Sequence, residues 1–173
     1  MKIHLIAPSG ASPDMRSPEA GLRWLKEQGV VVHNAACTER VFERFAGTDQ
    51  ERLAEMNAIP TIDPNEVVMA VRGGYGLHRL LDTITWKEIA ISVKQGLQIC
   101  GHSDFTGFHL GLLAKTGAMS LAGPMLNYDF GRIEDNQLVA PDPFMWAHFQ
   151  RAVQERSLSV QVNTSQLLSG LGN

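Results

Sequence analysis

The chain contains a run of five apolar residues, Val67 to Val71, that ends abruptly in the glycine-rich sequence Arg72-Gly73-Gly74-Tyr75-Gly76. A strand that is apolar at every position has to be covered on both faces, which is typical of the centre of a parallel sheet. Parallel strands need crossover connections, usually helices, and right-handed crossovers place these helices on both faces. The run therefore predicts an α/β fold.

The rest of the sequence alternates strand-like and helix-like segments. Strands are expected at residues 3–7, 30–33, 67–71, 97–100, 119–122 and 158–162, and helices at 17–28, 49–56, 77–81, 86–93, 105–115 and 144–151. Residues 38–45 are helical or loop-like. This order predicts a three-layer α/β domain with a parallel, Rossmann- or flavodoxin-like sheet flanked by helices.

Two helix starts carry recognisable capping signals. Ser17-Pro18-Glu19 combines an N-cap residue, a proline at the first helical position and an acidic first turn, and Gly29 marks the end of that helix. Thr48-Asp49-Gln50-Glu51 matches a capping box.

Length and composition restrict the class of protein. The chain has 173 residues and a net charge of −3 without a basic block, so neither nucleic acid nor an anionic membrane surface is an expected partner.

Residues 1–160 are expected to form one domain, and residues 161–173 the start of a linker to an absent C-terminal domain. The apolar N-terminus is expected to be a first strand, and two widely spaced cysteines, Cys37 and Cys100, indicate a reducing, cytoplasmic location.

Ser103 follows a strand and precedes a helix in the sequence Ile99-Cys100-Gly101-His102-Ser103-Asp104-Phe105. A serine on a sharp strand-to-helix turn can expose its hydroxyl next to the first helical amides, as in a nucleophile elbow. The alternative is a serine that only caps the following helix. The pattern Gly-x-Ser-x-Phe matches the α/β-hydrolase elbow only in part, and the local sequence leaves both interpretations open.

The loop from Arg72 to Gly76 has three glycines in five residues. Glycine permits positive φ and a close approach of the backbone to a ligand, so exposed amides here can form an anion or oxyanion cradle, with Arg72 available for a carboxylate. A plain tight turn is the alternative. The glycine spacing does not match a phosphate-binding loop.

A nucleophilic serine needs a base, usually a histidine held by a carboxylate. None of the six histidines has a spacing that makes it a persuasive partner of Ser103: His4, His33, His78, His102, His109 and His148. No sequence motif indicates a metal site, and no cofactor is expected.

Five blocks of sequence resemble, in this order, the LD-carboxypeptidases (the S66 serine peptidases, murein tetrapeptide carboxypeptidases, which also include microcin C immunity peptidases). They are Ile6 to Gly10, Arg44 to Thr48, Ala70 to Gly76, Ile99 to Thr106 and Gly123 to Met125. The resemblance implies a cytoplasmic enzyme of peptidoglycan recycling that removes the terminal D-alanine of murein tetrapeptides.

The resemblance also assigns roles to residues. It implies that Ser103 is the nucleophile, that the backbone amides of Gly74 and Asp104 form the oxyanion hole, and that Arg72, Gly73 and Tyr75 lie beside the substrate. Members of the family carry the glutamate and histidine of a Ser-Glu-His triad in a second domain. The chain is therefore expected to be the N-terminal half of such an enzyme, with little or no activity alone and with an exposed surface open to self-association.

Two other functions remain open. One keeps the fold and the chemistry but changes the substrate to a peptide-nucleotide antibiotic, as in the immunity peptidases. The other is a non-catalytic module in which the glycine-rich loops bind an anion or a peptide and Ser103 only caps a helix.

Overall fold

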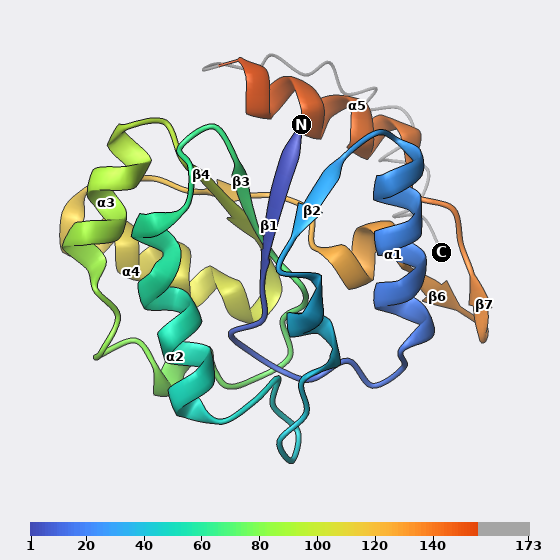
Figure 1. Ribbon diagram of the computed structural model, residues 1–173, viewed down its shortest axis with the longest axis horizontal. Coiled ribbons are helices and arrows are strands. Elements are labelled where there is room, and N and C mark those ends of the chain that lie inside the picture. The colour runs from blue at the N-terminus through green and yellow to red at the C-terminus, as the bar shows by residue number, and fades with distance from the viewer. Residues whose placement is uncertain (156–173) are drawn as a thin grey trace, which may run out of the picture.

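A five-stranded parallel sheet forms the centre of the computed structural model, which describes residues 1–155. Its strands are β1 (Lys2–Ile6), β2 (Val31–His33), β3 (Val67–Ala70), β4 (Gln98–Gly101) and β5 (Leu121–Ala122), in the spatial order β2-β1-β3-β4-β5 (Figure 1). This is the strand order of flavodoxin-like folds, in which ligands bind where the order reverses, between β1 and β3. The predicted fold class is confirmed.

Five α-helices connect and cover the strands: α1 (Arg16–Glu27), α2 (Asp49–Ala58), α3 (Trp86–Lys94), α4 (Thr106–Thr116) and α5 (Pro143–Gln154). Short 3₁₀ segments are η1 (Ala35–Glu39), η2 (Ile59–Thr61), η3 (Leu77–Arg79) and η4 (Ser103–Phe105), and η5 (Leu126–Phe130) is a π-helical turn. The capping box at Thr48 is present, with Thr48 Oγ1 accepting from the Glu51 amide and Glu51 accepting from the Thr48 amide.

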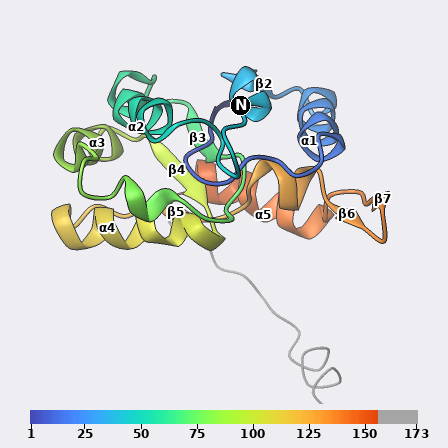
Figure 2. The ribbon, with the colours of Figure 1, turned by 90° about the horizontal axis from the view of Figure 1, so that it is seen from below.

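The strands bury side chains on both faces. In β3, Val67 and Met69 belong to the core under α1, η5 and α5, whereas Val68 and Ala70 belong to the core under α2, α3 and α4. Figure 2 shows the helices distributed on both sides of the sheet. The uniform apolar run of β3 thus serves two separate cores, as a central parallel strand requires.

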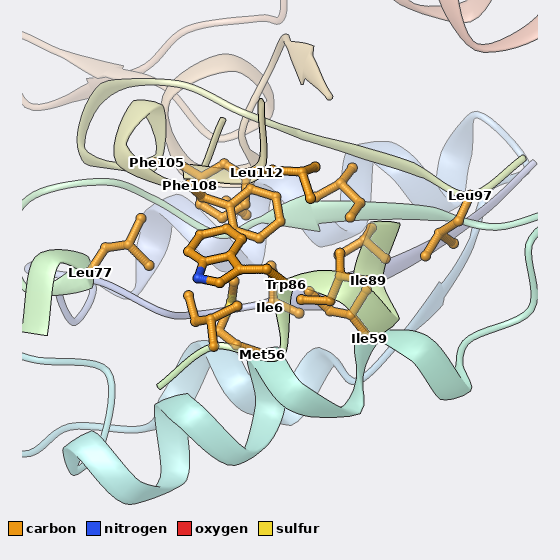
Figure 3. Packing of buried hydrophobic residues seen from close by; sticks show 14 of the residues in the cluster. Ile6, Met56, Ile59, Leu77, Trp86, Ile89, Leu97, Phe105, Phe108 and Leu112 are labelled. Atoms are coloured by element: carbon orange, nitrogen blue, oxygen red, sulfur yellow. The ribbon is translucent and has the colours of Figure 1, made fainter. Parts of the chain in front are cut away.

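Trp86 occupies the middle of the core that lies under α2, α3 and α4. Its ring lies 5.4 Å from that of Phe108, which stacks on Phe105 at 4.9 Å (Figure 3). A Cβ on Gly111 would come within 2.6 Å of the Trp86 ring, so only glycine allows α4 to approach it. This packing seats the start of α4, and with it the turn that precedes the helix.

Some local expectations are wrong. Helix α1 begins at Arg16 after Met15, and Ser17 does not cap it: Ser17 Oγ donates instead to the carbonyl of Asn127 at 3.0 Å. A small antiparallel hairpin, β6 (Ile133–Glu134) and β7 (Gln137–Leu138), follows η5 and was not expected. The strand expected at 158–162 and the linker expected at 161–173 lie outside the described residues.

Within residues 1–155, no helix combines the length and the hydrophobicity that crossing a bilayer requires.

Candidate active site

Ser103 lies at the end of β4 in a left-handed backbone conformation, with φ of 58°, and its side chain is exposed. Non-glycine residues seldom adopt this conformation, and a strained serine between a strand and a helix is the feature that defines a nucleophile elbow. The residue at the N-cap position of η4 is His102, and no side chain caps that end. Ser103 is therefore the first residue of η4 and not its cap, contrary to the alternative interpretation.

Two glycines allow the elbow to form. A Cβ on Gly101 would come within 2.7 Å of the Phe105 ring and 3.0 Å of Ala70 Cβ, so Gly101 lets η4 fold back on the sheet. A Cβ on Gly73 would lie 2.7 Å from Ser103 Oγ and 3.0 Å from the Asp104 amide nitrogen. The glycine-rich loop after β3 thus contacts the serine directly.

The loops after β1, β3 and β4 meet at the carboxyl edge of the sheet. The Gly10 amide donates to the Gly73 carbonyl at 3.0 Å, and the Leu77 amide donates to Asp104 Oδ2 at 3.1 Å. Gly74 has φ of 94°, and its amide makes no hydrogen bond to any residue of 1–155. An unpaired amide in the loop that contacts Ser103 can stabilise a developing negative charge.

Arg72 is held by its surroundings. Its guanidinium donates to the Ala11 carbonyl and, at 3.1 Å, to the Tyr128 hydroxyl. Together with Asn127, Tyr128 and Arg132 it lines a cavity of about 210 Å³ beside the loops. Asp14 also lines the cavity and Arg132 pairs with Glu134, so Arg72 is the lining arginine that has no acidic partner within residues 1–155 and can offer its charge to a carboxylate.

Tyr75 is exposed at the rim of the site. Its hydroxyl lies 3.2 Å from His78 Nε2, and the guanidinium of Arg44 lies 4.6 Å from the centre of its ring. Arg44 comes from a block that the family resemblance includes, but its contact with Tyr75 could not be inferred from the sequence.

His102, the neighbour of Ser103, is bound to a different residue. Its Nε2 lies 3.0 Å from Asp129 Oδ2, and the same carboxylate oxygen accepts from the Met125 amide at 2.7 Å. Asp129 was missed because η5 brings it to the site from 27 residues away. The pair joins the elbow to the loop after β5.

His109 also has no contact with Ser103. Its Nε2 lies 2.9 Å from the Gly101 carbonyl and its Nδ1 lies 2.6 Å from Ser120 Oγ. Burial lowers the pKa of His109, so its ring is neutral and bridges β4 to the segment before β5. Across residues 1–155, no side chain hydrogen-bonds Ser103 Oγ.

Cys100 is the other nucleophilic atom near the elbow. It is fully buried, its thiol donates to the Pro124 carbonyl at 3.3 Å, and burial raises its pKa. A buried thiol held in the protonated form does not act as a nucleophile. Ser103 is thus the nucleophile candidate at this edge of the sheet.

These observations define the class of protein. It is an α/β domain in which a strained serine elbow packs against a glycine-rich loop. The chain belongs to the S66 peptidase family: residues 3–123 match the model of the LD-carboxypeptidase N-terminal domain.

Named relatives agree with this assignment. The chain is similar to the murein tetrapeptide carboxypeptidase of Pseudomonas aeruginosa, with 29% identity over 98% of this chain and 50% of that protein. The crystal structure of muramoyltetrapeptide carboxypeptidase from Oxalobacter formigenes superposes with a TM-score of 0.76 and 36% identity, over 92% of this chain and 50% of that one. The microcin C7 self-immunity protein MccF of Escherichia coli is 29% identical over 64% of this chain and 31% of its own length. The chain spans about half the length of the first two relatives.

Proposed function

We propose that the chain carries the nucleophile of a serine-type LD-carboxypeptidase that removes the terminal D-alanine from a murein tetrapeptide. The observation that carries the proposal is the exposed Ser103 at φ of 58°, packed against Gly73. Membership of a carboxypeptidase family and the similarity to a murein tetrapeptide carboxypeptidase support the substrate class.

The proposed reaction forms an acyl-enzyme. Ser103 Oγ attacks the carbonyl carbon of the bond between the diamino acid and D-alanine while a base accepts the hydroxyl proton. The amides of Gly74 and Asp104 stabilise the oxyanion of the tetrahedral intermediate. The base gives its proton to the leaving amine of D-alanine. It then takes a proton from water, which attacks the ester carbonyl, and passes that proton to Ser103 Oγ as the ester bond breaks.

Substrate binding is assigned to the loop that precedes the oxyanion hole. Arg72 offers charge to a carboxylate of the peptide, Gly73 allows the substrate backbone to approach Ser103, and Tyr75 forms an exposed aromatic wall. Support comes from the position of all three residues in one loop beside the serine and from the place of Arg72 at the adjoining cavity.

We place the base for Ser103 outside residues 1–155, because no histidine or carboxylate of these residues contacts its hydroxyl. We therefore expect the 173-residue chain alone to release little or no D-alanine. A second domain that supplies a glutamate and a histidine accounts for this need. The two free, buried cysteines are consistent with the proposed cytoplasmic setting of peptidoglycan recycling.

The decisive experiment measures D-alanine release from murein tetrapeptide by the 173-residue chain and by a protein extended with the C-terminal half of a family member. The proposal expects release only by the extended protein, and its loss in Ser103→Ala. Release by the short chain would place the base within it. No release by a folded, extended protein would overturn the murein substrate.

A peptide-nucleotide antibiotic is the second candidate substrate, because MccF is among the relatives. The same extended protein is then assayed with an aminoacyl sulfamoyl nucleoside. Cleavage of this compound without D-alanine release would favour an immunity peptidase. Binding of either compound without cleavage would favour a non-catalytic module.

A further inference from the structure

Three side chains that are far apart in the sequence converge on the sheet face under α2. Within residues 1–155, His4, His33 and Glu66 are the one group of three whose metal-ligating atoms all lie within 4.8 Å of one another. They come from β1, the end of β2 and the residue before β3. The motifs of the sequence indicated no metal site, because no two of these residues are near neighbours in the chain.

The parallel register explains why they meet. His4 is the direct partner of His33 on β2 and of Val68 on β3, so the two imidazoles project from the same face. Residues two apart on a strand share a face, so Glu66 projects on the side of Val68. Glu66 then reaches across β1 to place Oε2 at 2.9 Å from His33 Nδ1.

The carboxylate of Glu66 is buried and has little positive charge beside it. Its side chain is 7% exposed, and His33 is the one side chain in the described part of the chain that hydrogen-bonds its carboxylate. No lysine or arginine of residues 1–155 neutralises it. A buried carboxylate without a permanent positive partner is costly, and a bound divalent cation would remove that cost.

We propose that His4, His33 and Glu66 bind a divalent transition metal ion of the Zn²⁺ type. Two imidazole nitrogens and one carboxylate oxygen form a ligand set that Zn²⁺ takes, with the fourth position left to water. Ligand atoms at about 2.0–2.2 Å from a tetrahedral Zn²⁺ lie about 3.3–3.6 Å apart, so side-chain rotations are enough to close the group.

The exposure of His33 allows this rearrangement. Its side chain is 42% exposed, which leaves a path for the ion and for the water ligand. When Nδ1 binds the metal, the ring proton that it shared with Glu66 moves to Nε2, where solvent accepts the hydrogen bond. Each imidazole then binds in its neutral form, as metal coordination requires.

The site is separate from the serine elbow. Glu66 lies at the amino end of β3, and the Arg72 loop follows its carboxyl end, about 20 Å of extended chain away at roughly 3.3 Å per residue. The ion would therefore tie the edge strand β2 to β1 and β3, and would not take part in peptide hydrolysis. The proposal does not depend on the proposed carboxypeptidase function.

Isothermal titration of the untagged, chelator-treated chain with Zn²⁺ tests the proposal. We expect one Zn²⁺ per chain with micromolar affinity, a tetrahedral absorption spectrum with Co²⁺ as the probe, and a rise in the unfolding temperature. Each of His4→Gln, His33→Gln and Glu66→Gln should weaken binding by roughly 10-fold or more, because a ligand is lost. His148→Gln removes a histidine of α5 and is the matched control.

The outcomes distinguish Zn²⁺ binding at this site from Zn²⁺ binding elsewhere on the chain. Binding that His148→Gln weakens as much as His33→Gln does, or no saturable binding at millimolar Zn²⁺, would overturn the proposal. His33→Gln alters a half-exposed residue at the end of an edge strand, so it keeps the test valid if a variant at the more buried Glu66 fails to fold. Ser103→Ala should bind Zn²⁺ like the wild type.

Discussion

Gly73 and Ser103 are in such close contact that a Cβ on Gly73 would lie 2.7 Å from the Ser103 hydroxyl oxygen. The two residues follow different strands, β3 and β4, so this contact holds the glycine-rich loop against the elbow. Any side chain at position 73 would have to displace the serine or its own loop.

Gly73→Ala is expected to lower the free energy of unfolding by about 1–3 kcal/mol through overpacking. It should also reduce D-alanine release by the extended protein roughly 100-fold, since a shift of about 1 Å at the nucleophile has that effect. Chemical denaturation and the D-alanine assay measure the two changes. Gly107→Ala is the control: its Cβ would lie 3.8 Å from the nearest atom, Leu77 Cδ2, and alanine should stabilise α4 by about 0.5–1 kcal/mol. Equal effects of the two substitutions would contradict the close contact.

Ser103→Gly should be more stable than Ser103→Ala by roughly 1 kcal/mol, because only glycine adopts φ of 58° without strain. Both substitutions remove the hydroxyl, so the extended protein should lose activity in either form. Urea unfolding of the two variants checks the difference. If alanine were as stable as glycine, the elbow would not be strained.

Arg52 and Arg79 both pair with Asp49 but differ in burial. Arg52 is 0% exposed and also donates to the Pro8 carbonyl, whereas the Arg79 side chain is 48% exposed. Arg52→Met should therefore cost about 2–3 kcal/mol of stability, through the loss of buried charged hydrogen bonds. Arg79→Met should cost less than about 1 kcal/mol. Thermal unfolding of the two variants measures the difference, and a larger loss of stability for Arg79→Met would refute the larger contribution assigned to the buried Arg52.

His109 should make stability depend on pH. Burial lowers its pKa in the folded state below its ordinary value of 6.5, so the unfolded chain binds the proton more tightly. The contribution of neutral His109 to folding stability is complete at a pH above the pKa of the unfolded state. It is lost as the pH falls through the lower pKa of the folded state. His109→Gln should have a shallower fall in stability than the wild type as the pH drops from about 7 to about 5. Denaturation midpoints across this range provide the measurement, and identical slopes would exclude His109 as the cause.

Local signals predicted those parts of the fold that depend on neighbouring residues. The apolar run of β3 and the capping box at Thr48 were correctly assigned because periodicity and caps act within a few residues. The prediction that Ser17 caps α1 was wrong because the Ser17 hydroxyl donates instead to the carbonyl of Asn127, which is 110 residues away. The β6–β7 hairpin was missed because its turn uses Asp135 and Asn136, both at positive φ, in place of the more familiar Asn-Gly.

In the candidate active site, too, the sequence predicted only the contacts between neighbouring residues. The glycines and the serine of the elbow were visible because strand, turn and helix are consecutive there. The contact of His102 with Asp129, and the convergence of His4, His33 and Glu66, depend on the register of separate strands and on η5. The expected second domain and self-association stay predictions.

The position of β1 has a consequence for any variant that lacks residues 1–14. β1 is an inner strand of the sheet, paired with β2 on one side and with β3 on the other. A variant that begins at Met15 would keep most of its mass but lose the strand that joins these two neighbours. It would also lose Gly10, whose amide donates to Gly73 in the glycine-rich loop that packs against Ser103. Loss of these residues would therefore separate β2 from the rest of the sheet. It would also leave the loop beside the Ser103 hydroxyl without its Gly10 contact.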